Sequence, residues 1–590
     1  MDSNYDYTPL QPGSIRLLFM SDEDPLQGFN SLQEVALDSA CRFRAISYFW
    51  GDSALTHSIK CDDQKMPITG NVAQLLSADV FHTLDEYLPV WIDAICINQS
   101  DNAEKADQVA IMHRIYSMAE EVLVWLGPPT HNSDLAMNVL GDLGKKPELK
   151  SYGNIEALTA EAQRLLQLPG VQEALGSFFI RPWFQRLWVI QELVLAKHAR
   201  MACGGKKITW QELASAVNAS IHLQPYGFGF LFRVDEVETA MRAIQGVGEI
   251  DYVDSEAKKS DGKNFTALMD VATRRDVTNP RDRVYGMLGL ASSYVRDHVQ
   301  IDYSDQSEEA LLELYIDTAK VAVRDDFSLS LLYIVTAAPR DPRLPSWCPN
   351  FGVRWDARLI LSPDWRAGIS RSGDSRLAKS WFEPGSDALY APGYIADTVA
   401  SVVSSTFSEA PGTDFAYPPL EHAQNNLEWI TGCQNLLKRI KPDENDDAPI
   451  WFLLTLSEGL VRIPFTTEDS LRQAYHRLIE IWSSAVSNTP LPSTTEFESS
   501  AALNFNQSLA HNCKGRKVFS TTGGRMGTGP ADTAVGDKVC ILYGAGSQYM
   551  LRLKEDDSGR LLGSAYVHYF KVFDDVLVED KAEERVFVIE

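Results

Sequence analysis

The sequence has few basic residues for its length. Among 590 residues, 54 are Lys or Arg and 80 are Asp or Glu, which gives a formal net charge of −26. A protein that binds nucleic acid phosphates or an anionic membrane surface needs a basic surface of its own. The composition therefore argues against nucleic acid and membranes as the main partners.

Long hydrophobic runs and secretion signals are also lacking. The longest apolar runs, such as residues 90–97, are far shorter than the roughly 18 residues of a membrane-spanning helix. The polar, acidic N-terminus does not have the basic and then apolar order of a signal peptide. Eight cysteines are scattered without a CxxC pair, which argues against a disulfide scaffold or a zinc motif. We expect a cytoplasmic protein with no membrane span and no metal site.

The remaining composition is that of an ordinary globular protein. Hydrophobic residues make up 45% of the chain and charged residues 23%, which is enough apolar material for several cores. No repeat of roughly 20 to 50 residues is apparent, which argues against a solenoid. Composition and pattern divide the chain into an N-terminal extension (1–40), an α/β domain (41–205), a mainly helical region (206–385) and a mixed, β-rich C-terminal region (386–590) with a polar linker near 483–500.

The α/β assignment depends on three short apolar runs. Residues 43–49, 90–97 and 122–126 are rich in β-branched and aromatic residues, which predicts buried strands. Between the last two lies a helix pattern, in which Asp101 is the expected N-cap and Glu104 the other half of a capping box. Strand, helix, strand units of this kind form parallel sheets. We predict a mostly parallel sheet flanked by helices, with Ile92 and Val124 buried on adjacent strands.

One carboxylate lies in an apolar helix pattern. The helix predicted over residues 185–197 is apolar around most of its circumference, yet Glu192 lies in its middle. An ionised carboxylate in such a place is costly unless it is paired or opens onto a cleft. Two interpretations follow: a buried ion pair with Arg181, Arg186 or another cation, or a catalytic group.

Three segments resemble a known family. FRAISYFWGD (43–52), the stretch from VWIDAICINQ to VLVWLG (90–127) and RPWFQRLWVIQELVLAKHARMACG (181–204) are similar, in this order, to the characteristic blocks of the fungal heterokaryon incompatibility (HET) domain. PRDRVYGMLGL (280–290) and LPSWCP (344–349) resemble segments that follow the domain in such proteins. The resemblance implies a role in non-self recognition between fungal cells and in the regulated cell death that follows incompatible fusion.

HET domains in turn resemble TIR domains more distantly, and some TIR domains hydrolyse NAD. The TIR catalytic glutamate follows a tryptophan by four residues in a helix, and Trp188 and Glu192 have this spacing. Ser47 and Tyr48 are similar to the serine and aromatic pair that ends the first TIR strand. This resemblance implies a TIR-like or flavodoxin-like fold, Glu192 as the catalytic residue and NAD as the candidate substrate, with no cofactor required.

The chemistry of NAD cleavage suits a single carboxylate. Breaking the bond between nicotinamide and ribose passes through an oxocarbenium-like state, whose positive charge a nearby carboxylate stabilises. The candidate ligand-binding residues around Glu192 are Ser47, Tyr48, Trp50, Asp52, Asp93 and Trp188. Asp93 has a second interpretation, as a cap of the turn over residues 94–99. Trp50 and Trp188 could stack on a ligand ring or belong to the core.

A non-enzymatic function is the alternative. In this interpretation the HET domain is a protein-protein interaction module that forms a homo-oligomer or recruits a protein partner from the cell-death machinery. The sequence leaves the choice between enzyme and interaction module open.

Overall fold

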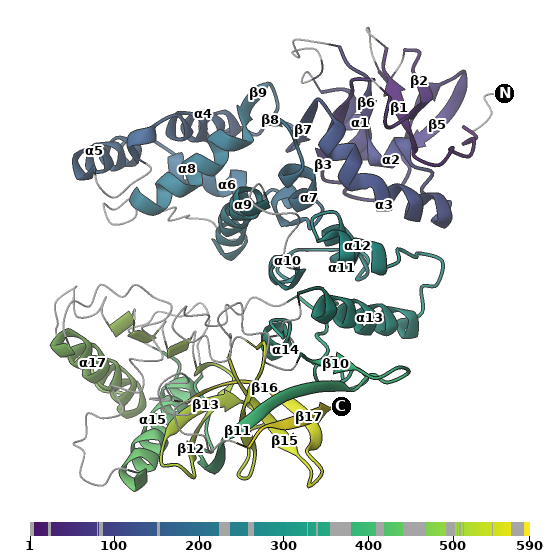
Figure 1. Cartoon of the computed structure of the whole chain (residues 1–590). Helices are drawn as coiled ribbons and strands as arrows, with labels where there is room; N and C mark the ends of the chain where they lie inside the picture. Colours follow the sequence, from purple (N-terminus) through teal and green to yellow (C-terminus); the bar gives the residue numbers. More distant parts are fainter. Residues whose placement is uncertain are drawn as a thin grey trace. The chain divides into compact units, whose positions relative to one another are not determined.

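The protein is described by a computed structural model of the whole chain, which divides into two compact units, residues 1–311 and 312–590 (Figure 1). The structure describes residues 5–21, 25–26, 28–39, 41–78, 81, 87–149, 154–223, 237–257, 265–326, 329–337, 340–354, 379–408, 418–440, 468–490, 502–503, 505–506, 509–510, 513–545, 547–567 and 583–590.

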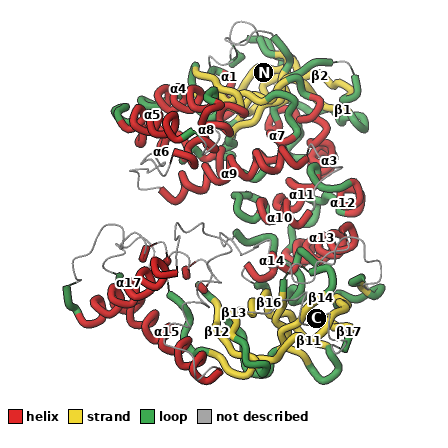
Figure 2. The backbone as a smooth tube through the Cα atoms, turned by 60° about the vertical axis from the view of Figure 1, so that its left-hand side comes forward, coloured by secondary structure: helices red, strands yellow, loops and turns green. Residues whose placement is uncertain are grey.

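A seven-stranded sheet organises the first unit, in the order β2-β1-β6-β3-β7-β8-β9. Its strands are β1 (Ser14–Phe19), β2 (Ser31–Ala36), β3 (Arg44–Tyr48), β6 (Val90–Trp91), β7 (Glu121–Trp125), β8 (Ala199–Cys203) and β9 (Lys206–Thr209). The four central strands β6, β3, β7 and β8 are parallel, and the pairs at both edges are antiparallel. Figure 2 shows these strands in yellow with helices in red beside them. The predicted sheet flanked by helices is confirmed, with antiparallel edges that the sequence did not indicate.

The order of the central strands differs from the prediction. β3 lies between β6 and β7, so the prediction that Ile92 and Val124 lie on adjacent strands is wrong. All five residues of β3 are buried, as a central strand requires. Ile92 is buried but follows the end of β6, where the short helix α2 (Asp93–Cys96) begins. The predicted strand over 90–97 is therefore two residues of strand and one turn of helix.

The N-terminal residues are built into this sheet. The segment expected as an extension, residues 1–40, supplies β1 and β2. Arg16 of β1 makes a two-pronged ion pair with Glu104, at 2.5 and 2.9 Å. Glu104 also accepts the N–H of Asn98 at 2.7 Å, so it does not form the predicted capping box. Asp101 does cap the helix α3 (Asn102–Met118), because its carboxylate accepts the N–H groups of Ala103 and Glu104.

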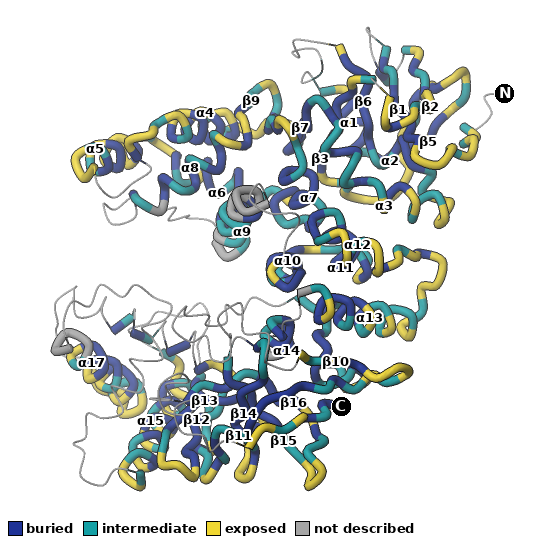
Figure 3. Tube along the Cα trace, in the orientation of Figure 1, coloured by how far each residue is buried: buried dark blue, intermediate teal, exposed yellow. Residues whose placement is uncertain are grey.

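Helices and one hairpin complete the first unit. They are β4 (His57–Cys61), β5 (Gln64–Ile68), α1 (Gly70–Leu76), α4 (Ser133–Gly144), η1 (Pro147–Leu149), α5 (Ile155–Leu166), α6 (Val171–Phe179), η2 (Pro182–Gln185), α7 (Val189–Val194), α8 (Trp210–Leu223), α9 (Val237–Ala257), α10 (Phe265–Ala272), α11 (Asp282–Leu288) and α12 (Ser293–His298), and α13 (Glu308–Asp326) crosses into the second unit. All six residues of α7 are buried (Figure 3). The mainly helical character predicted after the α/β domain is confirmed.

The second unit is built on an eight-stranded sheet. Its strands are β10 (Trp381–Phe382), β11 (Leu389–Val402), β12 (Arg516–Thr521), β13 (Met526–Pro530), β14 (Lys538–Leu542), β15 (Gln548–Leu553), β16 (Ser558–Val567) and β17 (Arg585–Ile589). Every pairing is antiparallel except β16 with β17. The long strand β11 pairs with four others, which closes the sheet on itself. The predicted β-rich C-terminal region is confirmed.

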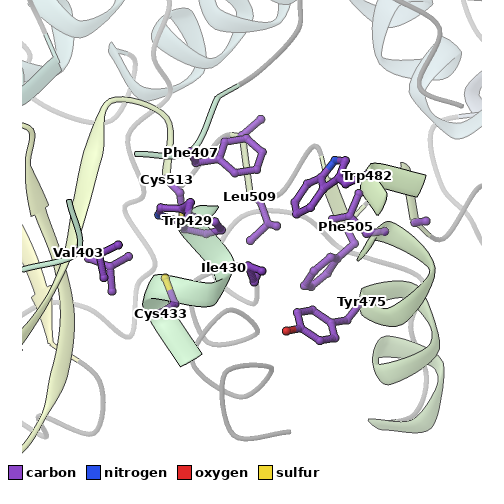
Figure 4. Close-up of a cluster of buried hydrophobic side chains, with 14 of the residues drawn as sticks. Val403, Phe407, Trp429, Ile430, Cys433, Tyr475, Trp482, Phe505, Leu509 and Cys513 are labelled. Carbon is purple, nitrogen blue, oxygen red and sulfur yellow. The ribbon is translucent and has the colours of Figure 1, made fainter. Parts of the chain in front are cut away.

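Helices α14 (Leu332–Ala337), α15 (Leu420–Ile440) and α17 (Glu468–Ser487) accompany this sheet. Aromatic side chains from α15 and α17, among them Trp429 and Trp482, gather in one apolar core (Figure 4). α17 extends into the linker predicted near 483–500, of which residues 491–500 lie outside the described residues. Within the described part of the chain, no helix has the length and hydropathy that a membrane span needs.

Candidate functional site

The topology of the first sheet identifies one edge as a place for a ligand. In chain order the parallel strands are β3, β6, β7 and β8, and their spatial order is second, first, third, fourth. The chain thus leaves β3 toward one side and later returns to its other side at β7. Ligands of doubly wound sheets bind outside the carboxyl ends of the strands at such a switch point. Ser47 and Tyr48 end β3 at this edge, and Asp93 lies two residues after the end of β6.

Glu192 is held by a hydrogen-bond chain of fixed direction. Its side chain lies in α7, and the residue is 1% exposed. The indole Nε1 of Trp183 donates to Ser47 Oγ at 2.8 Å, and Ser47 Oγ donates to Glu192 Oε2. An indole N–H can only donate, so the serine hydroxyl accepts from it and has its proton free for the carboxylate. Trp183 therefore orients Ser47, and Ser47 orients Glu192.

The same burial changes the acidity of Glu192. Burial raises the pKa of Glu192 to about 7, against the lowering effects of the nearby Arg186 charge and of hydrogen bonds from Ser47 and Tyr116. The charge of Asp93 adds to the increase. A carboxylate with this pKa changes its protonation state near neutral pH, where most glutamates are fully ionised.

The ion pair considered for Glu192 is not formed. Among the described residues, neither Arg181 nor Arg186 makes an ion pair with it. Arg181 donates to the carbonyl oxygens of Leu126, at 2.7 Å, and Pro128, at 3.3 Å. Arg186 donates to the carbonyl oxygen of Tyr48. The charge of Arg186 is therefore close enough to lower the pKa of Glu192. Its guanidinium nevertheless donates its hydrogen bond to the backbone and not to the Glu192 carboxylate.

Asp93 caps a turn, which is one of the two interpretations that the sequence left open, while its role in orienting a ligand stays a prediction. Its Oδ1 accepts the N–H of Ala94 at 2.8 Å, which caps the turn after β6. Its Oδ2 accepts from the indole of Trp50 at 2.8 Å, which ties the loop after β3 to this edge. Burial raises the pKa of Asp93, against the charge of Arg186. Asp93, Arg186 and Glu192 therefore form one electrostatic group, in which each acid makes the other harder to ionise.

The remaining candidates differ in their surroundings. Tyr48 is buried, and its hydroxyl lies close enough to Asp93 to lower the pKa of that carboxyl, although it makes no hydrogen bond of ordinary geometry in the part of the chain that the structure describes. Asp52 is exposed and accepts the N–H of Ala54 at 3.0 Å, so it forms a local turn. Trp188 precedes α7, and its indole donates to Asp282 at 3.4 Å. Trp50 and Trp188 are thus each bonded to an aspartate.

Three residues that contribute to the site around Glu192 were not identified from the sequence. Trp183 stands in the RPWF segment, where the need of a buried indole N–H for a partner was the available signal. For Tyr116, on α3, the only available signal was its place in the apolar helix pattern. Asp282 lies 94 residues from Trp188, and nothing local connects the two. Among the described residues, no group of three or more His, Cys, Asp or Glu side chains could hold a metal ion.

The fold and the site together define a class of protein. It is an α/β protein in which a buried carboxylate with a pKa near 7 lies at the switch point of a doubly wound sheet. A closed, mostly antiparallel β unit follows in the chain. Residues 43–192 match the family model described as heterokaryon incompatibility protein (HET), and residues 469–589 match the Het-6 β-barrel domain. Residues 43–192 therefore carry a HET domain, as their resemblance indicated.

A curated relative matches along most of both chains. Heterokaryon incompatibility protein 6, OR allele, from Neurospora crassa is 24% identical over 611 aligned residues, which cover 88% of this chain and 88% of the relative. No solved structure gives a significant match. The relative has both a similar length and a similar order of segments, so the likeness is not confined to the HET domain.

Proposed function

We propose that this protein acts in non-self recognition between fungal cells, and that its α/β domain is an effector of regulated cell death in the cytoplasm. The match to the HET model and the name of the Neurospora relative support the first part. The second part depends on what the domain does, for which the site around Glu192 offers an enzymatic mechanism.

That mechanism is hydrolysis of NAD. Water adds to C1′ of the ribose while the bond from C1′ to the nicotinamide nitrogen breaks. Nicotinamide leaves with the bonding electron pair as a neutral molecule, and the water gives one proton to the solvent, so the products are nicotinamide, ADP-ribose and a proton. The ionised carboxylate of Glu192 stabilises the positive charge that develops on the ribose. No cofactor takes part.

One observation carries this proposal: a carboxylate is oriented by a dedicated hydrogen-bond chain and yet has no cation paired with it. A structural glutamate in a core is normally neutralised by a direct ion pair. Glu192 instead has its pKa near 7 and a serine that holds one oxygen in place. Perturbed acids in such settings are enriched at functional sites. The buried hydroxyl of Tyr48, beside Asp93, is a second polar group at the same edge that a ligand could engage.

The second candidate function is a non-enzymatic module that binds a protein partner or a second copy of the chain. Glu192 is 1% exposed, so in this conformation a substrate does not reach it. The loop after β3 exposes two large apolar side chains, Phe49 at 38% and Leu55 at 64%. Exposed apolar groups beside a closed site favour a function in assembly.

Cellular NAD separates the two candidates. We expect fungal cells that express the active protein to lose NAD before they lose viability, because NAD loss is the cause of death in the enzymatic mechanism. Both quantities are measured over time in one culture, with an empty-vector culture as the control. Death without a preceding fall in NAD would eliminate the enzyme and leave the interaction module.

A further inference from the structure

We propose that residues 275–291, called here the cradle segment, hold α7 in place and thereby control Glu192. The functional unit would then extend almost a hundred residues beyond residue 192, where the match to the HET model ends. The effect on activity rests on the proposed function, whereas the effect on α7 does not.

The need for a cradle follows from the length of α7. The helix has six residues, which is too short to be stable without tertiary contacts. No side chain caps its N-terminus, since the N-cap residue Trp188 makes no capping hydrogen bond, and at its C-terminus the cap is the backbone N–H of Leu195. Its position must therefore be set by whatever packs on it.

The backbone before α7 is clamped by the cradle segment. The N–H of Asp276 donates to the carbonyl of Gln185 at 2.8 Å, and the N–H of Leu187 donates to the carbonyl of Asp276 at 3.2 Å. Arg275 is buried, and its guanidinium donates to the carbonyl of Phe184 at 2.8 Å and to that of Gly246 at 2.9 Å. The residues that precede α7 thus form hydrogen bonds with a segment that lies almost ninety residues later in the chain.

Two glycines of α11 and its end allow the cradle to lie close to α7. A Cβ atom on Gly286 would stand 2.9 Å from Leu187 Cδ2. One on Gly289 would stand 2.6 Å from both Gln191 Oε1 and the Cβ of His113, which belongs to α3. A Cβ is fixed to its backbone and cannot rotate away. Gly289 therefore sets the spacing between the cradle segment and α3, and an added Cβ would also displace the buried side-chain amide of Gln191, which belongs to the helix that carries Glu192.

A polar contact fixes the beginning of α7. Asp282 accepts from the indole of Trp188 at 3.4 Å and from the hydroxyl of Tyr303 at 2.8 Å. The ammonium of Lys105, on α3, lies 4.4 Å from the centre of the Tyr303 ring. The cradle segment thus connects α7 to α3 at the beginning of α7 and again at Gln191, and α3 supplies Tyr116 to Glu192. Asp282 and Gly289 are positioning residues.

The test is amide hydrogen exchange of α7 in the full-length chain. In Gly289→Ala we expect the amides of residues 189–195 to exchange about tenfold faster or more, because overpacking displaces the helix, while those of β7 change little. Gly248→Ala is the matched control, because Gly248 lies within α9 and an added Cβ there meets no atom within 4 Å. In the control variant, the amide exchange rates of both α7 and β7 should stay unchanged.

A second variant covers the case in which Gly289→Ala does not fold. Asp282→Ala adds no bulk and removes both hydrogen bonds, so it should also speed exchange in α7. Unchanged α7 exchange in either variant, once folded, would overturn the cradle. Cellular NAD loss is measured in parallel, and it should decrease in the variants whose α7 amides are less protected from hydrogen exchange. If the unaltered protein causes no NAD loss, the proposed function fails, and the exchange data still decide whether the cradle holds α7.

Discussion

Glu192→Gln is expected to make the protein more stable at pH 8, and the advantage should shrink toward pH 5. The pKa of Glu192 is about 7 in the folded protein, above the ordinary glutamate pKa of 4.5. The folded state therefore binds more protons than the unfolded state between these values, so the stability of the unaltered protein falls as pH rises toward 7. At 1.36 kcal/mol per pKa unit, the fall between pH 5 and pH 8 is about 3 kcal/mol. Glutamine has no charge to bury and avoids this loss.

Urea unfolding of both proteins at pH 5 and pH 8 measures the effect, since other titrations cancel in the difference. Glu212→Gln is a control that should show no pH-dependent effect in this range. Partial burial raises the pKa of Glu212, but hydrogen bonds from Thr209 and the ammonium of Lys145 together outweigh it, and the net shift is downward. The stability that a lowered pKa provides is lost only as the pH falls below about 4.5, so its replacement should cost about the same at pH 8 and at pH 5. A Glu192→Gln protein that is less stable than the unaltered chain at pH 8 would mean that the charge is structural.

Arg16→Ala is expected to destabilise the first unit by about 3 to 5 kcal/mol, because it leaves the carboxylate of Glu104 buried without its cation. The two side chains are 3% and 10% exposed. Arg16 also donates to the carbonyl oxygens of Thr8 at 2.6 Å and Cys96 at 3.0 Å. One residue thus joins the N-terminal segment, the turn before α3 and α3 itself.

Arg42→Ala is the matched control for Arg16. Arg42 pairs with Glu120 at 3.0 Å, and both side chains are about half exposed, so its loss should hardly change stability. Urea unfolding monitored by tryptophan fluorescence compares the two variants. Equal stability of both would contradict the integration of residues 1–40 into the α/β fold.

The sequence predicted the elements of the fold better than their arrangement. Uniformly apolar runs marked β3 and β7 because both are buried on two faces. The strand order was missed because a buried run does not show which strand lies beside it. β1 and β2 were missed because the second alternates weakly, with exposed Gln33 and Glu34, in a polar and acidic segment. Long-range pairing, which local patterns do not record, decided both.

The site shows the same division between local and distant signals. Glu192 could be found because one acid in an otherwise apolar helix is locally anomalous. The direction of Arg186 could not be found, because only the folded chain brings the carbonyl of Tyr48 to its guanidinium. Trp183 and Asp282 act through partners 136 and 94 residues away. The buried carboxylate was therefore predictable, and the residues that orient it were mostly not.

The most direct test of Glu192 as the functional carboxylate is killing by Glu192→Gln per amount of folded protein. Viability of expressing cells is measured together with the soluble, protease-resistant amount of each protein. We predict that Glu192→Gln accumulates at least as well as the unaltered chain and does not kill. Undiminished killing by the folded variant, or a loss of killing that only follows a loss of folded protein, would contradict a functional role for this charge.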